Sequence, residues 1–97
     1  MIVSFKDQAT EDIFNGQSSR IARKACPQTI WRVAVRKLDQ LDSVESLDEL
    51  KVPPGNRLEA LSGNRKGQYS IRINDQFRIC FQWGESGPEE VEITDYH

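Results

Sequence analysis

The chain has 97 residues, of which 37% are hydrophobic and 29% charged, and its formal net charge is −2. This size suits one domain over residues 1–97, and the composition is typical of a globular protein rather than a disordered one. No apolar run approaches the roughly 18 residues that a membrane helix needs, and MIVSFKDQ has no signal-peptide core. Two cysteines make no disulfide framework, and Cys80 within FRICF is expected to be a buried, reduced thiol. A cytoplasmic protein is predicted.

Charge is distributed unevenly along the chain. Residues 20–37 contain six basic side chains and no acid, and residues 51–78 contain six more against Glu59 and Asp75. The net charge therefore does not exclude nucleic acid as a partner, because the fold can still present a basic face.

The first half of the chain predicts a short strand and two helices. Residues 2–5 (IVSF) are an apolar strand candidate, and residues 7–14 predict a short helix. Pro27 suits the first turn of the next helix. Apolar side chains recur at spacings of three and four within residues 28–43, which predicts a second and longer helix.

The second half predicts a sheet. One extra turn is expected at 47–50 and a loop at 53–56, where two prolines and a glycine exclude regular structure. Strands are expected over residues 68–73, 77–83 and 90–96. The resulting order, β-α-α-β-β-β, predicts an α+β fold with two helices packed on one face of an antiparallel sheet.

The register of the central hairpin places two arginines together. A three-residue loop over residues 74–76 pairs Ile71 with Ile79, so that both apolar faces meet one core, and a one-residue slip would invert every side chain. In this register Arg72 and Arg78 are opposed on the face away from the helices. They are either solvated or neutralised by Glu92, or they form an anion site in which a phosphate relieves their repulsion.

The alternation of side chains along the last predicted strand also assigns a face of the sheet to each residue at the end of the chain. If Val91 and Ile93 face the core, Tyr96 lies on the arginine face together with Glu92 and Thr94. Asp95 and His97 point the other way by the same parity.

The residue types exclude several kinds of catalytic site. With one histidine and two distant cysteines the chain lacks a metal-ligand cluster, and it contains no nucleophile elbow or phosphate-binding glycine loop. RNA supplies its own nucleophile, the 2′-hydroxyl, so metal-free cleavage needs proton-transfer groups and cations around the phosphate. The candidate proton-transfer residues are Glu59, Asp95, Tyr96 and His97. The segment SGNRKGQ (62–68) is either a polar turn or a basic loop that approaches a phosphate backbone. No cofactor is expected.

Three segments carry a family resemblance. The stretch PPGNRLEALSGNRKGQYSIRINDQFRICFQW (53–83), the terminal EITDYH and the opening MIVSF resemble the HigB branch of the RelE toxin superfamily, the killer proteins of toxin–antitoxin operons. The resemblance implies a RelE-like toxin domain over residues 1–97 that enters the ribosomal A site and cleaves messenger RNA there without a metal, arresting translation and growth. It also implies a partner, a HigA-like helix-turn-helix antitoxin that neutralises the toxin and represses the shared operon.

The resemblance implies roles for individual residues. Asp95, Tyr96 and His97 match the family's active-site ending, and Arg78 matches its phosphate-stabilising arginine. We expect Tyr96 and His97 to transfer protons, Asp95 to position them, and Arg78 to bear the developing charge. The expected RNA-binding residues are Arg57, Arg65, Lys66 and Arg72.

Glu59 departs from the family pattern. Other members have a histidine at this position and use it for acid–base work. Glu59 either serves as the base or pairs with Arg57 or Arg65, and the pairing is the favoured interpretation.

Two other classes of function remain open. The same basic face would serve a non-catalytic RNA- or ribosome-binding module, and helices over 7–14 and 28–43 would serve a protein-interaction subunit. An antitoxin could neutralise the chain by laying an acidic segment across the basic face or by clasping the helices far from it.

Overall fold

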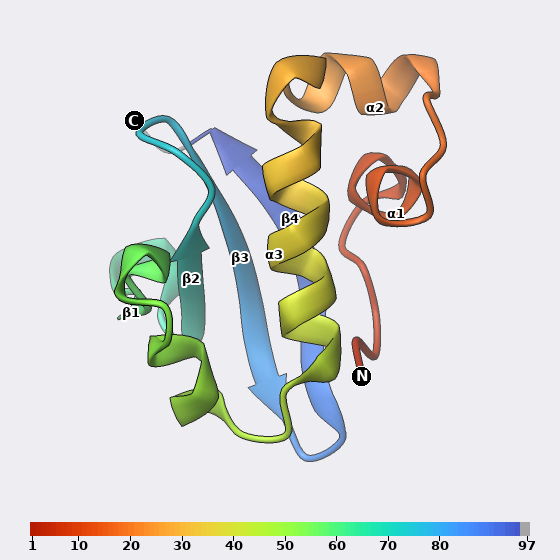
Figure 1. Cartoon of the computed structure of the whole chain (residues 1–97). Helices are drawn as coiled ribbons and strands as arrows, with labels where there is room; N and C mark the ends of the chain where they lie inside the picture. Colours follow the sequence, from red (N-terminus) through yellow and green to blue (C-terminus); the bar gives the residue numbers. More distant parts are fainter. Residues whose placement is uncertain (96–97) are drawn as a thin grey trace.

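The computed structural model describes residues 1–95, which form helices packed on one face of an antiparallel sheet (Figure 1). Within these residues the sheet has four strands in the order β1-β2-β3-β4. The strands are β1 (Glu59–Ala60), β2 (Gln68–Arg72), β3 (Phe77–Gly84) and β4 (Gly87–Asp95). The α-helices are α1 (Gln8–Phe14), α2 (Arg20–Ala25) and α3 (Trp31–Ser43). The predicted α+β class is confirmed.

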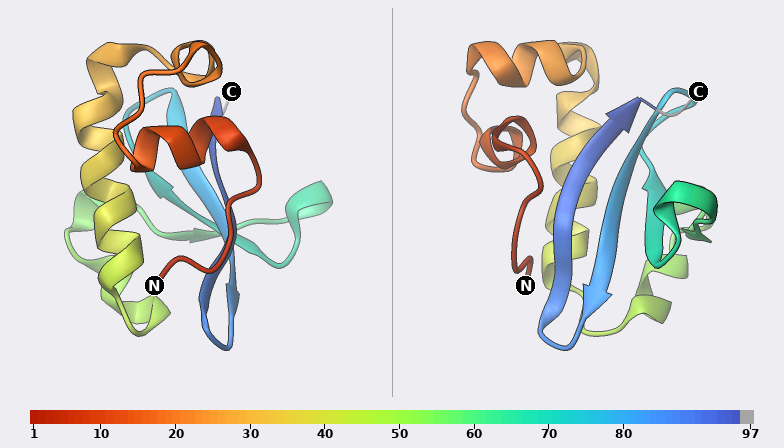
Figure 2. Two further views of the ribbon diagram at one scale, coloured as in Figure 1. Left: turned by 90° about the vertical axis from the view of Figure 1, so that its right-hand side faces the viewer. Right: turned by 180° about the vertical axis from the view of Figure 1, so that it is seen from behind.

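Helix α3 supplies the helical side of the core. Its residues Ala34, Leu38 and Leu41 are fully buried and belong to one cluster with Ile71 and Ile79 of the sheet. Seen from behind, β3 and β4 lie in front of α3, so the helix covers only one face of these strands (Figure 2). The helix predicted over 28–43 is confirmed, although its first three residues form a 3₁₀ turn.

Further 3₁₀ turns shape the connection between α3 and β2. They span Leu47–Lys51, Pro54–Asn56 and Gly63–Arg65. The first is the extra turn predicted at 47–50. The second lies in the loop predicted at 53–56, and β1 follows it as a two-residue strand that the sequence did not indicate.

Helix α2 was also not predicted. Its N-cap is Ser19, whose hydroxyl accepts a hydrogen bond from the amide of Ala22 at 3.2 Å. The same hydroxyl donates to a carboxylate oxygen of the buried Asp12 at 2.6 Å, which ties α2 to α1. Ala22 is the one buried residue of this helix, so no apolar stripe marks it in the sequence.

The predicted strand over residues 2–5 is reduced to a single parallel bridge between Phe5 and Val91. The chain leaves the sheet directly afterwards, because Asp7 caps α1 by accepting from the amide of Thr10 at 2.7 Å. Thr10 then accepts a hydrogen bond from the amide of Ile93 at 2.9 Å. The N-terminal segment and α1 therefore cover the outer edge of β4.

The predicted hairpin register is confirmed. Ile71 pairs with Ile79 and Arg72 with Arg78. The loop between β2 and β3 is closed by Asn74, whose side chain accepts from the amides of Gln76 and Phe77 at 2.9 and 2.7 Å. In the part of the chain that the structure describes, no helix is long and apolar enough to cross a membrane.

Candidate functional site

The opposed arginines lie in a hollow on the sheet face away from α3. This arginine hollow has a volume of about 200 Å³. It is lined by Arg57, Glu59, Arg72, Asn74, Asp75 and Arg78. Three arginines thus line a space that suits a small anion.

Arg78 is held in place by neutral acceptors. Its side chain is 10% exposed. Its Nε donates a hydrogen bond to the hydroxyl of Ser70, and its Nη2 donates to the backbone carbonyl of Arg57, both at 2.7 Å. These bonds fix the plane of the guanidinium without cancelling its charge, so the hollow keeps a preorganised cation.

The carboxylates of the hollow are more exposed than the arginine at its centre. Glu59 lies with Oε1 3.9 Å from Nη1 of Arg78, and its side chain is 53% exposed. Arg72 forms an ion pair with Asp75, whose side chain is 95% exposed. Exposed pairs of this kind contribute about 0–1 kcal/mol, so an incoming phosphate can take the place of either carboxylate. The predicted partners of Glu59, Arg57 and Arg65, were wrong, because within residues 1–95 Glu59 pairs with Arg78 instead.

The loop before β1 positions the carbonyl that holds Arg78. Arg57 has left-handed backbone angles, φ 45° and ψ 56°, and directly follows the turn Pro54–Asn56. Asn56 is fully buried, and its amide nitrogen donates to the Leu50 carbonyl at 3.1 Å. Its side-chain oxygen accepts from Nζ of Lys37. The strained residue Arg57 therefore lies between two anchors. The buried amide of Asn56 holds it on one side, and the guanidinium of Arg78, which the Arg57 carbonyl orients, holds it on the other.

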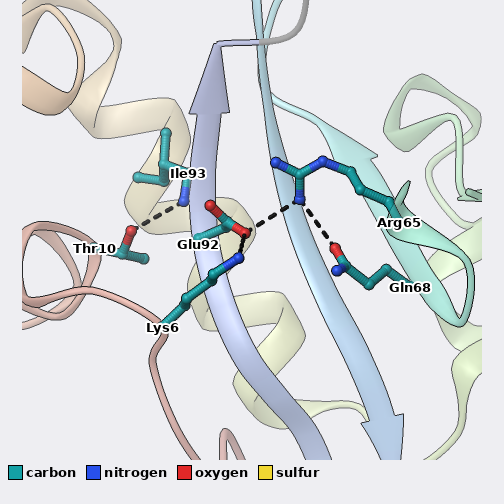
Figure 3. Close-up of polar contacts among 6 residues, drawn as sticks. All are labelled: Lys6, Thr10, Arg65, Gln68, Glu92 and Ile93. Atoms are coloured by element: carbon teal, nitrogen blue, oxygen red, sulfur yellow. Dashed lines mark hydrogen bonds and ion pairs between the residues drawn. The ribbon is translucent and has the colours of Figure 1, made fainter. Parts of the chain in front are cut away.

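Among residues 1–95, the ion pairs of Glu92 are with Lys6 and Arg65 and not with the opposed arginines, contrary to the interpretation in which Glu92 neutralises them. Glu92 forms a separate group, the Glu92 cluster, with Lys6 and Arg65 (Figure 3). One carboxylate oxygen of Glu92 lies 3.2 Å from Lys6 Nζ and 3.2 Å from Arg65 Nη1, and the Glu92 side chain is 13% exposed. Arg65 also donates to Gln68 at 3.0 Å. Of the predicted basic loop, Arg65 is thus tied to the sheet, whereas Lys66 is exposed and does not line the hollow.

The structure does not bring every candidate residue together. Arg78, Glu59, Arg57 and Arg72 meet in the arginine hollow. Asp95 does not line it, and its carboxylate accepts a hydrogen bond from Gln76 at 3.0 Å. Tyr96 and His97 lie outside the described residues.

Two residues of the site were missed in the sequence, Ser70 and Asn56. Ser70 shares the parity of Arg72 on β2 and could have been placed beside Arg78 by the same alternation. Nothing local distinguishes Asn56, whose role depends on contacts with α3.

Cysteine and acidic side chains form no metal site in residues 1–95, since no three of these ligand types gather there. Cys26 and Cys80 are buried and free, as expected for Cys80 from the sequence. Burial raises the pKa of the Cys80 thiol above its ordinary value.

Comparisons with known proteins agree with this fold. The family model described as the RelE-like toxin of type II toxin–antitoxin system HigB matches residues 3–97. Toxin HigB-1 of Vibrio cholerae serotype O1 is 40% identical over 83 residues, which cover 86% of this chain and 84% of that protein. An uncharacterised protein of Haemophilus influenzae is 37% identical over 57 residues, or 59% of this chain and 56% of that protein.

Solved structures share the fold at lower identity. In the YoeB–YefM complex from Staphylococcus aureus, the similar chain superposes with a TM-score of 0.56 at 22% identity, covering 100% of this chain and 95% of that chain. The YoeB/ParE toxin from Agrobacterium tumefaciens superposes with a TM-score of 0.53 at 19% identity, covering 99% and 98%. Together with the match to the family model, the fold and its arginine-lined sheet face lead to one conclusion: this chain belongs to the HigB family of RelE-like toxins of type II toxin–antitoxin systems.

Proposed function

We propose that this toxin is a metal-independent endoribonuclease of the cytoplasm that cleaves messenger RNA on the ribosome and thereby arrests translation and growth. The observation that carries the proposal is the state of Arg78. Its guanidinium is almost buried, is oriented by Ser70 and the Arg57 carbonyl, and opens on a hollow shared with two more arginines. Such a group suits a negative charge that grows at a fixed point.

Cleavage by the 2′-hydroxyl passes through a crowded phosphorane with extra negative charge on its oxygens. A cation whose orientation is set before the reaction stabilises this charge without reorganisation. Arg78 turns Nη1 towards the exposed Glu59 carboxylate, and a phosphate that displaces this carboxylate takes its place on Nη1. Arg57 and Arg72 hold the same phosphate from the rim of the hollow.

We assign the proton transfers to the end of the chain. Tyr96 and His97 exchange protons with the 2′-hydroxyl and the leaving 5′-oxygen, and Asp95 positions them. Glu59 pairs with Arg78 until the substrate arrives and does not act as the base. Arg65 and Lys66 contact the RNA outside the hollow. Membership of the RelE-like toxins supports these roles.

The partner in this proposal is a HigA-like antitoxin with a helix-turn-helix. A solved structure that resembles this chain is a heterotetrameric YoeB–YefM toxin–antitoxin complex from Staphylococcus aureus, which supports an antitoxin as partner. The substrate is messenger RNA in the ribosome.

The test is induced expression with and without the antitoxin, followed by mapping of messenger RNA 5′ ends. The unaltered chain should give cuts at ribosome-determined positions and stop growth, and the antitoxin should suppress both. Arg78→Ala and His97→Ala should lose cleavage while remaining folded and bound by the antitoxin. Full toxicity in both variants would contradict the mechanism. Tyr96→Phe separates cutting from binding, because a module that only binds RNA would tolerate it.

A further inference from the structure

A second and larger hollow lies beside the arginine hollow. This α3 groove has a volume of about 590 Å³ and runs between α3, the loop at 53–55 and the end of β2. Its lining includes the apolar residues Val33, Pro53 and Ile73 and the cations Arg36, Lys37 and Arg72. The size is typical of a pocket for one small organic group.

The charge of the α3 groove is unbalanced. Among residues 1–95, no aspartate or glutamate lines it. Arg72 is paired with the exposed Asp75, but neither Arg36 nor Lys37 forms an ion pair among residues 1–95. Burial, and then the positive charge of Arg36, lowers the pKa of Lys37 below its ordinary value. An anion in the groove would relieve this repulsion.

The α3 groove and the arginine hollow meet at the C-terminal end of β2. Arg72 and Asn74 line both. An RNA strand whose scissile phosphate lies between Arg72 and Arg78 therefore has its next nucleotide beside Arg72, at the entrance of the groove. A lining with both apolar and cationic side chains matches the two parts of a nucleotide, since the base has an apolar face and the phosphate is charged.

We propose that the α3 groove binds the nucleotide adjoining the scissile phosphate, with its phosphate on Arg36 and Lys37 and its base on Val33, Pro53 and Ile73. The inference rests on the proposed function and extends it. It assigns the groove a part in choosing where the message is cut, because the base beside the scissile phosphate would contact protein there. The groove favours RNA over an acidic protein segment because it continues directly from the phosphate site.

The first test compares two exposed arginines of α3. Arg36→Gln removes a cation of the groove, and Arg32→Gln removes one that does not line it. With ribosomes and a defined message, Arg36→Gln should slow single-turnover cleavage about tenfold and alter the relative use of cut sites. Arg32→Gln should match the unaltered chain in both respects. Equal rates and equal cut sites in all three proteins would overturn the inference and leave the proposed function standing. No cuts by the unaltered chain would overturn both.

The second test measures binding without cleavage. The probe is a single-stranded oligonucleotide with 2′-deoxyriboses, titrated by fluorescence anisotropy over a series of salt concentrations. Removing one phosphate-binding cation should reduce the magnitude of the slope of log affinity against log salt by about 0.7. The slope measured for Arg36→Gln should therefore be smaller in magnitude than that for Arg32→Gln by about this amount. Identical slopes would overturn the inference. So would an Arg36→Gln variant that cuts normally but escapes the antitoxin, since the groove would then belong to the antitoxin.

Discussion

Two charge clusters centre on the same face of the sheet and differ in which sign is buried. In the Glu92 cluster the carboxylate is 13% exposed and the surrounding Lys6 and Arg65 are 53% and 30% exposed. In the arginine hollow the order is reversed, because Arg78 is 10% exposed and Glu59 is 53% exposed. A buried charge depends on its partners, whereas an exposed partner is easily replaced. The Glu92 cluster therefore stabilises the fold, and the arginine hollow is suited to exchanging one anion for another.

The largest effect should come from breaking the geometry of the arginine hollow. Arg78→Lys keeps the charge but removes the planar fork that Ser70 and the Arg57 carbonyl orient. We expect cleavage of ribosome-bound messenger RNA to fall about 10²–10³-fold, the usual cost of one preorganised donor. The measurement is the single-turnover rate from primer extension, with Arg32→Lys as the control. A rate within about threefold of the unaltered chain would show that charge alone suffices at this position.

A smaller effect, on stability, should come from the Glu92 cluster. Glu92→Gln removes the charge that Lys6 and Arg65 share and leaves two cations facing each other. The free energy of unfolding should fall by about 1–2 kcal/mol. In thermal unfolding this lowers the midpoint by roughly 4–8 °C for each kcal/mol. The exposed Glu85, changed to Gln, is the control and should stay within about 0.5 kcal/mol. Equal midpoints for the two variants would refute the role given to the cluster.

A further carboxylate, that of Asp12 in α1, can be compared with those of the two charge clusters. Hydrogen bonds from Ser19 and then Gln8 lower its pKa below the ordinary value of 3.8. A carboxyl group whose pKa is lower in the folded state stabilises the fold above that ordinary value, and this stability is lost as the pH falls through the lowered pKa. Asp12→Asn should therefore unfold at lower urea concentration at neutral pH, and the difference from the unaltered chain should shrink below pH 3.8. A difference that is constant from neutral pH down to about pH 2 would contradict this account.

The smallest effect on stability should come from Asp75. Its pair with Arg72 is almost fully exposed on the carboxylate side, so Asp75→Asn should change the free energy of unfolding by less than about 0.5 kcal/mol. The same substitution removes a negative charge from the arginine hollow and should tighten binding of the 2′-deoxy oligonucleotide. Weaker binding would mean that Asp75 holds Arg72 in its working position.

The sequence predicted the features of the site that depend on the alternation of side chains along a strand. It did not predict the features that depend on contacts between residues far apart in the chain. Parity and the three-residue loop over 74–76 together place Arg72 opposite Arg78, because a one-residue slip would bury a charge. The sequence could not show that the carbonyl of Arg57, 21 residues before Arg78, orients its guanidinium. Nor could it show that Glu59 pairs with Arg78, since β1 is two exposed residues long and leaves no periodic signal.

The pairing of the N-terminal segment with β4 determines where a strand from another molecule can add to this sheet. The outward amides of Val91 and Ile93 already donate to the Ser4 carbonyl and the Thr10 hydroxyl. A strand from another molecule finds these donors occupied. At the opposite edge of the sheet, within residues 1–95, β1 offers two residues with strand geometry. Fibril-like stacking of copies through sheet edges, which needs longer runs of unpaired backbone, is disfavoured at both sides. The N-terminal segment of this toxin thus protects the β4 edge against pairing with a second copy of the chain.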